Sequence, residues 1–66
     1  MNKIYKEFDY DYYAENLHKL IGNREHYDPD LVYLVKMLAL VLDGKDLFPN
    51  QQKAIDRYID LEITNG

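Results

Sequence analysis

The 66-residue sequence contains no cysteine and no serine, and Thr64 is its only threonine. These absences exclude the Ser-His-Asp and Cys-His arrangements of nucleophilic catalysis, and they exclude disulfide bonds. A chain without cysteine is consistent with the reducing cytoplasm, where we expect this protein to be located. A domain of this length buries only about 60% of the surface that its unfolded chain exposes, so a binding partner would add useful stability.

Positive charge is also scarce, because eight lysine and arginine residues stand against twelve aspartate and glutamate residues, for a net charge of −4. This balance disfavours direct binding to nucleic acid or to an anionic membrane, whereas it permits a basic protein partner. The longest apolar segment is shorter than the ~20 residues that span a bilayer. The first residues also lack the apolar segment of a signal peptide, so we expect no membrane association.

Hydrophobic periodicity and helix-end residues indicate a single all-α domain covering residues 1–66, with residues 1–8 as an irregular N-terminal arm. We predict three helices, near residues 9–21, 29–43 and 49–63. Asp9 and Asp28 can cap the first two helices, since an aspartate side chain accepts hydrogen bonds from the free N–H groups of a first turn. Gly44 follows the second helix, at a position where glycine commonly ends a helix.

The middle helix is apolar on nearly every side. Its predicted core face consists of Leu31, Leu34, Val35, Leu38, Val41 and Leu42. A second apolar edge consists of Tyr33, Met37 and Leu40. Exposed apolar patches on small proteins commonly mark association sites, so this edge is a candidate for a homodimer seam or for contact with another protein. The alternative is that Ile4, Tyr5 and Phe8 of the arm cover it.

The stretch EFDYDYYAEN at residues 7–16 combines acids with aromatic rings. Helical phase places Tyr10 and Tyr13 toward the core and Tyr12 on the outer face. We therefore predict a partner-binding acidic-aromatic face that consists of Glu7, Asp9, Asp11, Tyr12 and Glu15. An aromatic anchor in polar surroundings is typical of a protein interface. The competing interpretation is that these acids only favour the start of a helix and keep the domain soluble.

The last helix has a predicted buried stripe of Ile55, Tyr58, Ile59 and Ile63, and Leu47 and Phe48 in the preceding loop are expected to cover one end of the core. Together with the middle helix, it could form a helix-turn-helix. The residue types that would then read bases are present at Asn50, Gln51, Gln52, Lys53 and Arg57. However, Asp56 and Asp60 interleave with the two basic residues and would repel phosphate.

The sequence contains no residue pattern typical of a metal site or of a catalytic site. Glu15 and His18 form one Glu-x-x-His pair, but di-iron bundles need two such pairs and two further glutamates. The paired aspartates fall at predicted helix ends or in loops, where capping explains them. We therefore expect no metal, no cofactor and no enzymatic activity.

These observations favour a small, acidic, non-catalytic protein–protein interaction module. The form we favour is a modulator or inhibitor of a larger host protein, of the kind encoded by phages or mobile elements, and imitation of nucleic acid is one way in which such a protein could act. Its partner would be a protein, and a basic or nucleic-acid-binding protein is one candidate. The alternatives are a helix-turn-helix DNA-binding regulator that uses the last helix, and a structural homodimer or assembly subunit.

Overall fold

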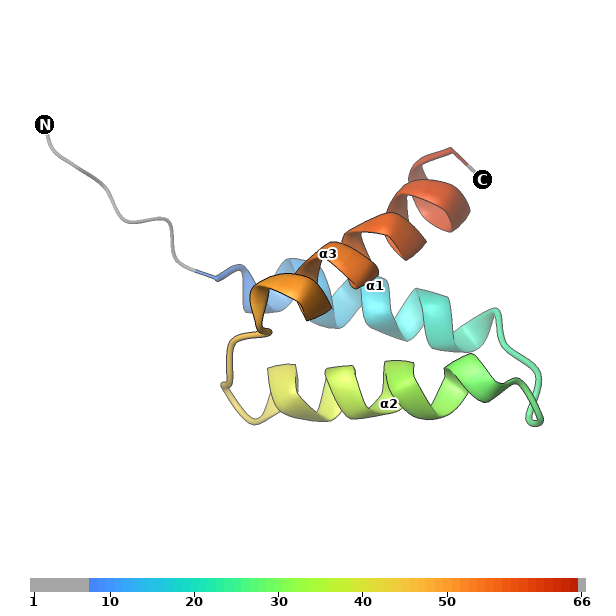
Figure 1. Ribbon diagram of the computed structural model, residues 1–66, viewed down its shortest axis with the longest axis horizontal. Helices are drawn as coiled ribbons and strands as arrows, with labels where there is room; N and C mark the ends of the chain where they lie inside the picture. The colour runs from blue at the N-terminus through green and yellow to red at the C-terminus, as the bar shows by residue number, and fades with distance from the viewer. Residues whose placement is uncertain (1–7, 66) are drawn as a thin grey trace, which may run out of the picture.

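A computed structural model describes residues 8–65, and these form three helices and a terminal turn (Figure 1). The elements are α1 at Tyr10–Gly22, α2 at Pro29–Leu42, α3 at Pro49–Ile59 and a π-helical turn, η1, at Asp60–Thr64. The part of the chain that the structure describes contains no strand. The predicted small three-helix all-α domain is thereby confirmed. Residues 1–7 of the predicted arm lie outside the described residues.

Local sequence determines where the first two helices begin and end. The Asp9 carboxylate accepts a hydrogen bond from the Tyr12 backbone N–H at 3.1 Å, and the Asp28 carboxylate accepts one from the Asp30 N–H at 2.8 Å. Asp9 and Asp28 are therefore the N-cap residues of α1 and α2, as the sequence predicts. Gly44 has a φ of +80°, a left-handed conformation that favours glycine just beyond the end of α2.

The helix in the middle of the bundle is α1. Figure 1 shows α2 running antiparallel to α1 on one side, while α3 crosses α1 on the other side, and both helices contact α1. The core consists of Tyr13, Leu17, Leu20, Leu34, Met37, Leu38, Val41, Leu47, Ile55 and Ile59. Because α1 is covered from two sides, its buried arc is wide and includes the polar residue Asn16, whose amide donates to the Tyr12 carbonyl at 2.8 Å.

The predicted orientation of α2 is wrong in part. Val35 and Leu42 were expected in the core but are 46% and 66% exposed, whereas Met37 of the predicted second edge is only 4% exposed. Tyr33 and Leu40 are half-buried and pack against the core. The Tyr33–Met37–Leu40 edge is therefore not an open surface. The helix is apolar over two overlapping arcs, so its neighbours decide which arc is buried.

Two aromatic side chains also lie elsewhere than expected. Tyr10 is 37% exposed, because it stands in the first turn of α1 and reaches out to the loop after α2, where its hydroxyl donates to the Gly44 carbonyl at 3.1 Å. Phe48 is exposed, whereas Leu47 is buried in the core as expected. Phe48 occupies the N-cap position of α3, where its backbone N–H donates to the Gln51 side chain at 2.9 Å.

The last helix changes type near its end. The sequence predicts one helix to residue 63, but the α-helix ends at Ile59 and the chain continues as the wider turn of η1. The expected stripe is present, with Ile55 and Ile59 buried and with Tyr58 and Ile63 half-buried. Between residues 8 and 65, no helix combines the length and the apolar character needed to cross a membrane.

Candidate functional site

The predicted acidic-aromatic face lies at the start of α1. Asp9, Asp11 and Glu15 are exposed, and Tyr12 is 44% exposed, as predicted. Glu7 lies outside the described residues. The Glu15 carboxylate is 3.7 Å from the Lys19 ammonium, one helical turn further on, and both side chains are largely in solvent. Such an exposed pair contributes little to stability, so both groups remain available to a partner.

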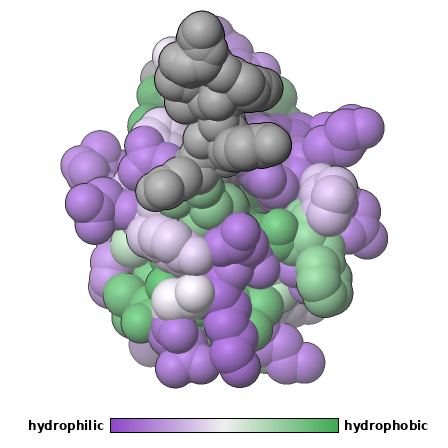
Figure 2. All heavy atoms as spheres, turned by 90° about the vertical axis from the view of Figure 1, so that its left-hand side faces the viewer, coloured by the Kyte–Doolittle hydropathy of each residue, from purple (hydrophilic) through white to green (hydrophobic). Residues whose placement is uncertain are grey.

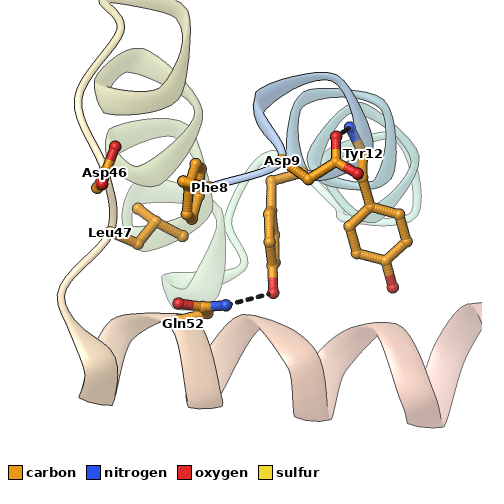
Figure 3. Close-up of a pocket in the computed structure, with 7 residues that line it drawn as sticks. Phe8, Asp9, Tyr12, Asp46, Leu47 and Gln52 are labelled. Carbon is orange, nitrogen blue, oxygen red and sulfur yellow. Dashed lines mark hydrogen bonds between the residues drawn. The ribbon is translucent and has the colours of Figure 1, made fainter. Parts of the chain in front are cut away.

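An open pocket of about 530 Å³ adjoins this face, between the start of α1, the loop after α2 and the first turn of α3 (Figure 3). Its lining residues are Phe8, Asp9, Tyr12, Tyr13, Asp46, Leu47 and Gln52. Asp9 and Tyr12 belong to the predicted face, whereas Asp46 and Gln52 were not assigned to it. Their position could have been predicted from an antiparallel pairing of α1 and α2, because this pairing brings the end of α2 back to the start of α1.

Aromatic rings form one wall of this region. Phe8 stacks on Tyr13 with ring centroids 4.8 Å apart, and it meets Tyr10 edge-on at 5.0 Å. Tyr12 also meets Tyr13 edge-on, at 5.0 Å. Stacked and edge-to-face pairs at these separations are favourable, so the four rings support one another's positions.

The Tyr13 hydroxyl links α1 to α3. It donates to the Asp56 carboxylate at 2.6 Å and accepts from the Gln52 side-chain amide at 3.0 Å. Burial of the hydroxyl, reinforced by its hydrogen bond to Asp56, raises the pKa of Tyr13 to about 12. The hydroxyl therefore stays protonated at neutral pH and keeps its role as a donor, which holds the aromatic wall against α3.

The pocket keeps hydrogen-bond acceptors that its own network does not use. One carboxylate oxygen of Asp9 accepts the capping hydrogen bond from the Tyr12 backbone N–H. One carboxylate oxygen of Asp46 accepts a hydrogen bond from the Tyr10 hydroxyl. Gln52 uses its amino group toward Tyr13, which leaves its carbonyl oxygen. Within residues 8–65, no lysine, arginine or histidine nitrogen lies within 4.0 Å of the carboxylates of Asp9, Asp11 or Asp46.

The opposite end of the bundle contains a different charge cluster, which sequence analysis missed. The Arg24 side chain is only 9% exposed, and its two terminal nitrogens donate to the two carboxylate oxygens of Glu62, one of them at 2.9 Å. Its guanidinium carbon lies 5.3 Å from the centre of the Tyr58 ring. Its Nε is 3.8 Å from the Asp28 carboxylate, which is too far for a hydrogen bond.

The Arg24–Glu62 contact changes the pKa values of both groups. Hydrogen bonding to Glu62 raises the pKa of Arg24, and the hydrogen bond from Arg24 lowers the pKa of the Glu62 carboxyl. Each charge is thus stabilised by the other in the folded protein. The two residues are far apart in the sequence, and no local spacing pointed to their contact.

The residues proposed to read DNA are partly engaged within the fold. The Gln51 side chain accepts the Phe48 N–H, and the Gln52 side chain donates to Tyr13. Asp56 is exposed on α3 together with Lys53 and Arg57, and Asp60 is exposed at the start of η1. A phosphate backbone approaching this helix would meet both signs of charge, which weakens the argument for direct DNA binding.

The metal-ligand candidates do not form a cluster. His18 and His26 are exposed. Among residues 8–65, no three histidine, aspartate or glutamate side chains are grouped closely enough to hold a metal ion. Glu15 is paired instead with Lys19.

Comparison with known proteins adds no functional information. No protein-family model, curated protein or solved structure matches this chain. The proposals that follow therefore rest on the chain's own geometry and chemistry.

Proposed function

We propose that this protein is a non-catalytic binding domain whose acidic-aromatic face binds a basic surface on a partner protein. The observation that carries the proposal is the grouping of exposed Asp9, Asp11, Tyr12 and Glu15 at the start of α1, beside an open pocket. Carboxylates attract a basic surface and steer its approach, while an exposed tyrosine supplies contact area. No described lysine or arginine neutralises Asp9 or Asp11 at close range.

The biological role within this proposal is that of a modulator or inhibitor of a larger protein. A basic surface that normally binds nucleic acid is the natural target, because a row of carboxylates can occupy the positions of phosphates. A small size and a net charge of −4 are compatible with such a role in a phage or mobile element. A cytoplasmic location is part of this proposal and follows from the target class.

Affinity capture from a lysate of the source organism tests the proposal, provided that matched charge variants are compared. The Asp11→Lys/Glu15→Lys variant reverses two charges on the proposed face. The control variant, Glu25→Lys/Asp60→Lys, reverses two exposed charges away from the start of α1. We expect a protein that the wild type and the control retain, that the face variant loses, and that added salt releases. Equal retention by all three proteins would contradict the proposal.

A structural homodimer is the second candidate, and a specific observation favours it. Val32, Val35 and Leu42 are exposed along α2, and Ala39 between them is exposed too. Their spacing of three, four and three residues forms one apolar stripe, as in a helix–helix seam. This stripe replaces the predicted edge at Tyr33, Met37 and Leu40.

Analytical ultracentrifugation tests the dimer. The wild type would sediment as a dimer at high concentration, and Leu42→Glu would sediment as a folded monomer. A wild type that stays monomeric at about 1 mM would eliminate this candidate, because its dissociation free energy would then be below about 4 kcal/mol.

A further inference from the structure

The Arg24 site shows how this fold holds a guanidinium group. One carboxylate, Glu62, accepts from both terminal nitrogens, and one aromatic ring, Tyr58, lies beside the group at 5.3 Å. Paired hydrogen bonds and stacking on a ring are the two contacts that suit a planar guanidinium. The same two ingredients, carboxylates and aromatic rings, recur at the other end of the bundle around the open pocket.

The pocket presents its acceptors from three directions. In Figure 3, Asp46 lies on one side with Leu47 and Phe8, Asp9 and Tyr12 lie on the other side, and Gln52 lies beneath them on α3. Asp9 and Asp46 each have one carboxylate oxygen without a hydrogen bond within residues 8–65, and Gln52 has a carbonyl oxygen in the same state. The lining of the pocket therefore includes two negative charges and three acceptors, and no described cation lies within 4.0 Å of either carboxylate.

The face of the molecule around the start of α1 has a mixed character. Figure 2 views the bundle from this end and shows hydrophobic patches surrounded by hydrophilic atoms. A ligand for such a site needs an apolar or planar part to cover rings and leucine, and donors to reach the carboxylates. The volume of about 530 Å³ falls within the range of pockets that bind small ligands, so it accommodates a long side chain.

We propose that this pocket binds an arginine side chain of the basic partner, with its guanidinium between Asp9 and Asp46 and its methylene chain along Phe8 and Tyr12. The inference rests on the proposed function and makes it specific. Arginine fits better than lysine because its planar group has five donors for separate acceptors and stacks on aromatic rings, whereas an ammonium is a compact, strongly hydrated point charge.

The test is a titration of the full-length ¹⁵N-labelled protein, followed by NMR, with acetyl-Gly-Arg-Gly-amide and with the same peptide carrying citrulline or lysine. Citrulline keeps the shape of arginine but lacks the charge. We expect saturable shifts of the backbone amides of Asp9, Tyr12, Leu47 and Gln52 with the arginine peptide. The citrulline peptide should bind at least about five-fold more weakly, because it loses charge-assisted bonds and cation–π contact. The lysine peptide should fall between them.

Charge-neutral variants sharpen the test. Asp46→Asn and Asp9→Asn each remove one pocket charge, and asparagine at position 9 still caps α1. Each should weaken binding of the arginine peptide about three-fold, the effect expected from the loss of one exposed ion pair. Glu25→Gln removes one exposed charge from the loop between α1 and α2 and should leave the affinity unchanged.

Several outcomes would overturn the inference. Equal affinity for arginine and citrulline peptides would show that charge is not recognised, and equal or tighter binding of lysine would exclude a guanidinium site. None of these results decides the proposed function, because the capture experiment tests Asp11 and Glu15, which do not line the pocket.

Discussion

The two ends of this small bundle use the same residue types in different ways. At one end, Arg24 is buried against Glu62 and Tyr58, so that its charge is satisfied within the chain. At the other end, Asp9 and Asp46 lie beside aromatic rings around an open pocket, and no cation from residues 8–65 pairs with them. Carboxylates and rings thus stabilise the fold where the chain supplies its own arginine. At the pocket end, where no cation of residues 8–65 pairs with the carboxylates, they lie in the surface for which we propose a basic ligand.

This comparison predicts that mutations at the two ends affect different properties. Changes at the Arg24 end should lower the free energy of unfolding. Replacing the exposed pocket carboxylates of Asp9 and Asp46 by asparagine should alter binding and leave stability nearly unchanged. Tyr13 also lines the pocket, but it is buried in the core and its loss should lower stability. A small domain has little stability to lose, so the first class of effects should be easy to detect.

The largest effect is expected from Arg24→Ala. This substitution leaves the Glu62 carboxylate without its partner and removes a nearly buried side chain, so the free energy of unfolding should fall by about 3 kcal/mol. Urea unfolding followed by circular dichroism measures it. The matched control is Arg57→Ala, which removes an exposed arginine and should change stability by less than about 0.5 kcal/mol. Similar effects of the two substitutions would show that the Arg24 cluster has no special role.

A smaller effect is expected from Tyr13→Phe, which removes the hydrogen bonds to Asp56 and Gln52 but keeps the ring. We expect a loss of about 1.5–3 kcal/mol in unfolding free energy, the usual magnitude for hydrogen bonds that involve a charged group.

Alkaline pH gives this substitution a second readout. The pKa of Tyr13 is raised from 10.0 to about 12 in the folded protein, so the associated stabilisation is complete below pH 10 and is lost as the pH rises toward 12. The stability difference between wild type and Tyr13→Phe should therefore shrink over that interval. A constant difference across it would argue against a Tyr13 hydroxyl that is buried and hydrogen-bonded to Asp56 in the folded protein.

Acid should weaken the Arg24 end. The pKa of Glu62 is lowered from 4.5 by its hydrogen bonds with Arg24, so its stabilising contribution is present above pH 4.5 and is lost as the pH falls through the lower, folded-state pKa. Glu62→Gln should flatten this part of the stability profile. Unfolding midpoints measured at stepped pH values below 5 would show it, and parallel profiles for the two proteins would contradict the assignment.

The smallest effect on stability is expected from Asp46→Asn at the pocket end. Its carboxylate is exposed, and the one hydrogen bond that it accepts from residues 8–65 comes from the Tyr10 hydroxyl, which asparagine can still satisfy through its carbonyl oxygen. The free energy of unfolding should change by less than about 0.5 kcal/mol. A loss above 1 kcal/mol would mean that Asp46 stabilises the fold, which would remove the contrast between the two ends.

Features coded by adjacent residues were predictable from the sequence. Asp9, Asp28 and Gly44 act at the ends of helices through bonds and dihedral angles within a few residues, so their roles follow from local rules. The exposure of Tyr12 and the burial of Tyr13 follow from the phase of one helix.

Features that depend on how the helices pack were not predictable in the same way. The predicted orientation of α2 was wrong at Val35 and Leu42. Both candidate faces of the helix are apolar, so packing against α1 and α3 determines which face is buried. Asp46 and Gln52 join the pocket only because α1 and α2 run antiparallel and α3 crosses α1. Arg24 meets Glu62 across 38 residues of sequence, a distance at which spacing carries no information.

The most direct test of the contrast between the two ends is a measurement of intermolecular nuclear Overhauser effects between the full-length protein and the arginine peptide. The account predicts contacts from the arginine side-chain methylene protons to the ring protons of Phe8 and Tyr12, with no contacts to Tyr58. Contacts confined to Tyr58, to Val35 and Leu42 on α2, or absent altogether at saturating peptide would contradict it.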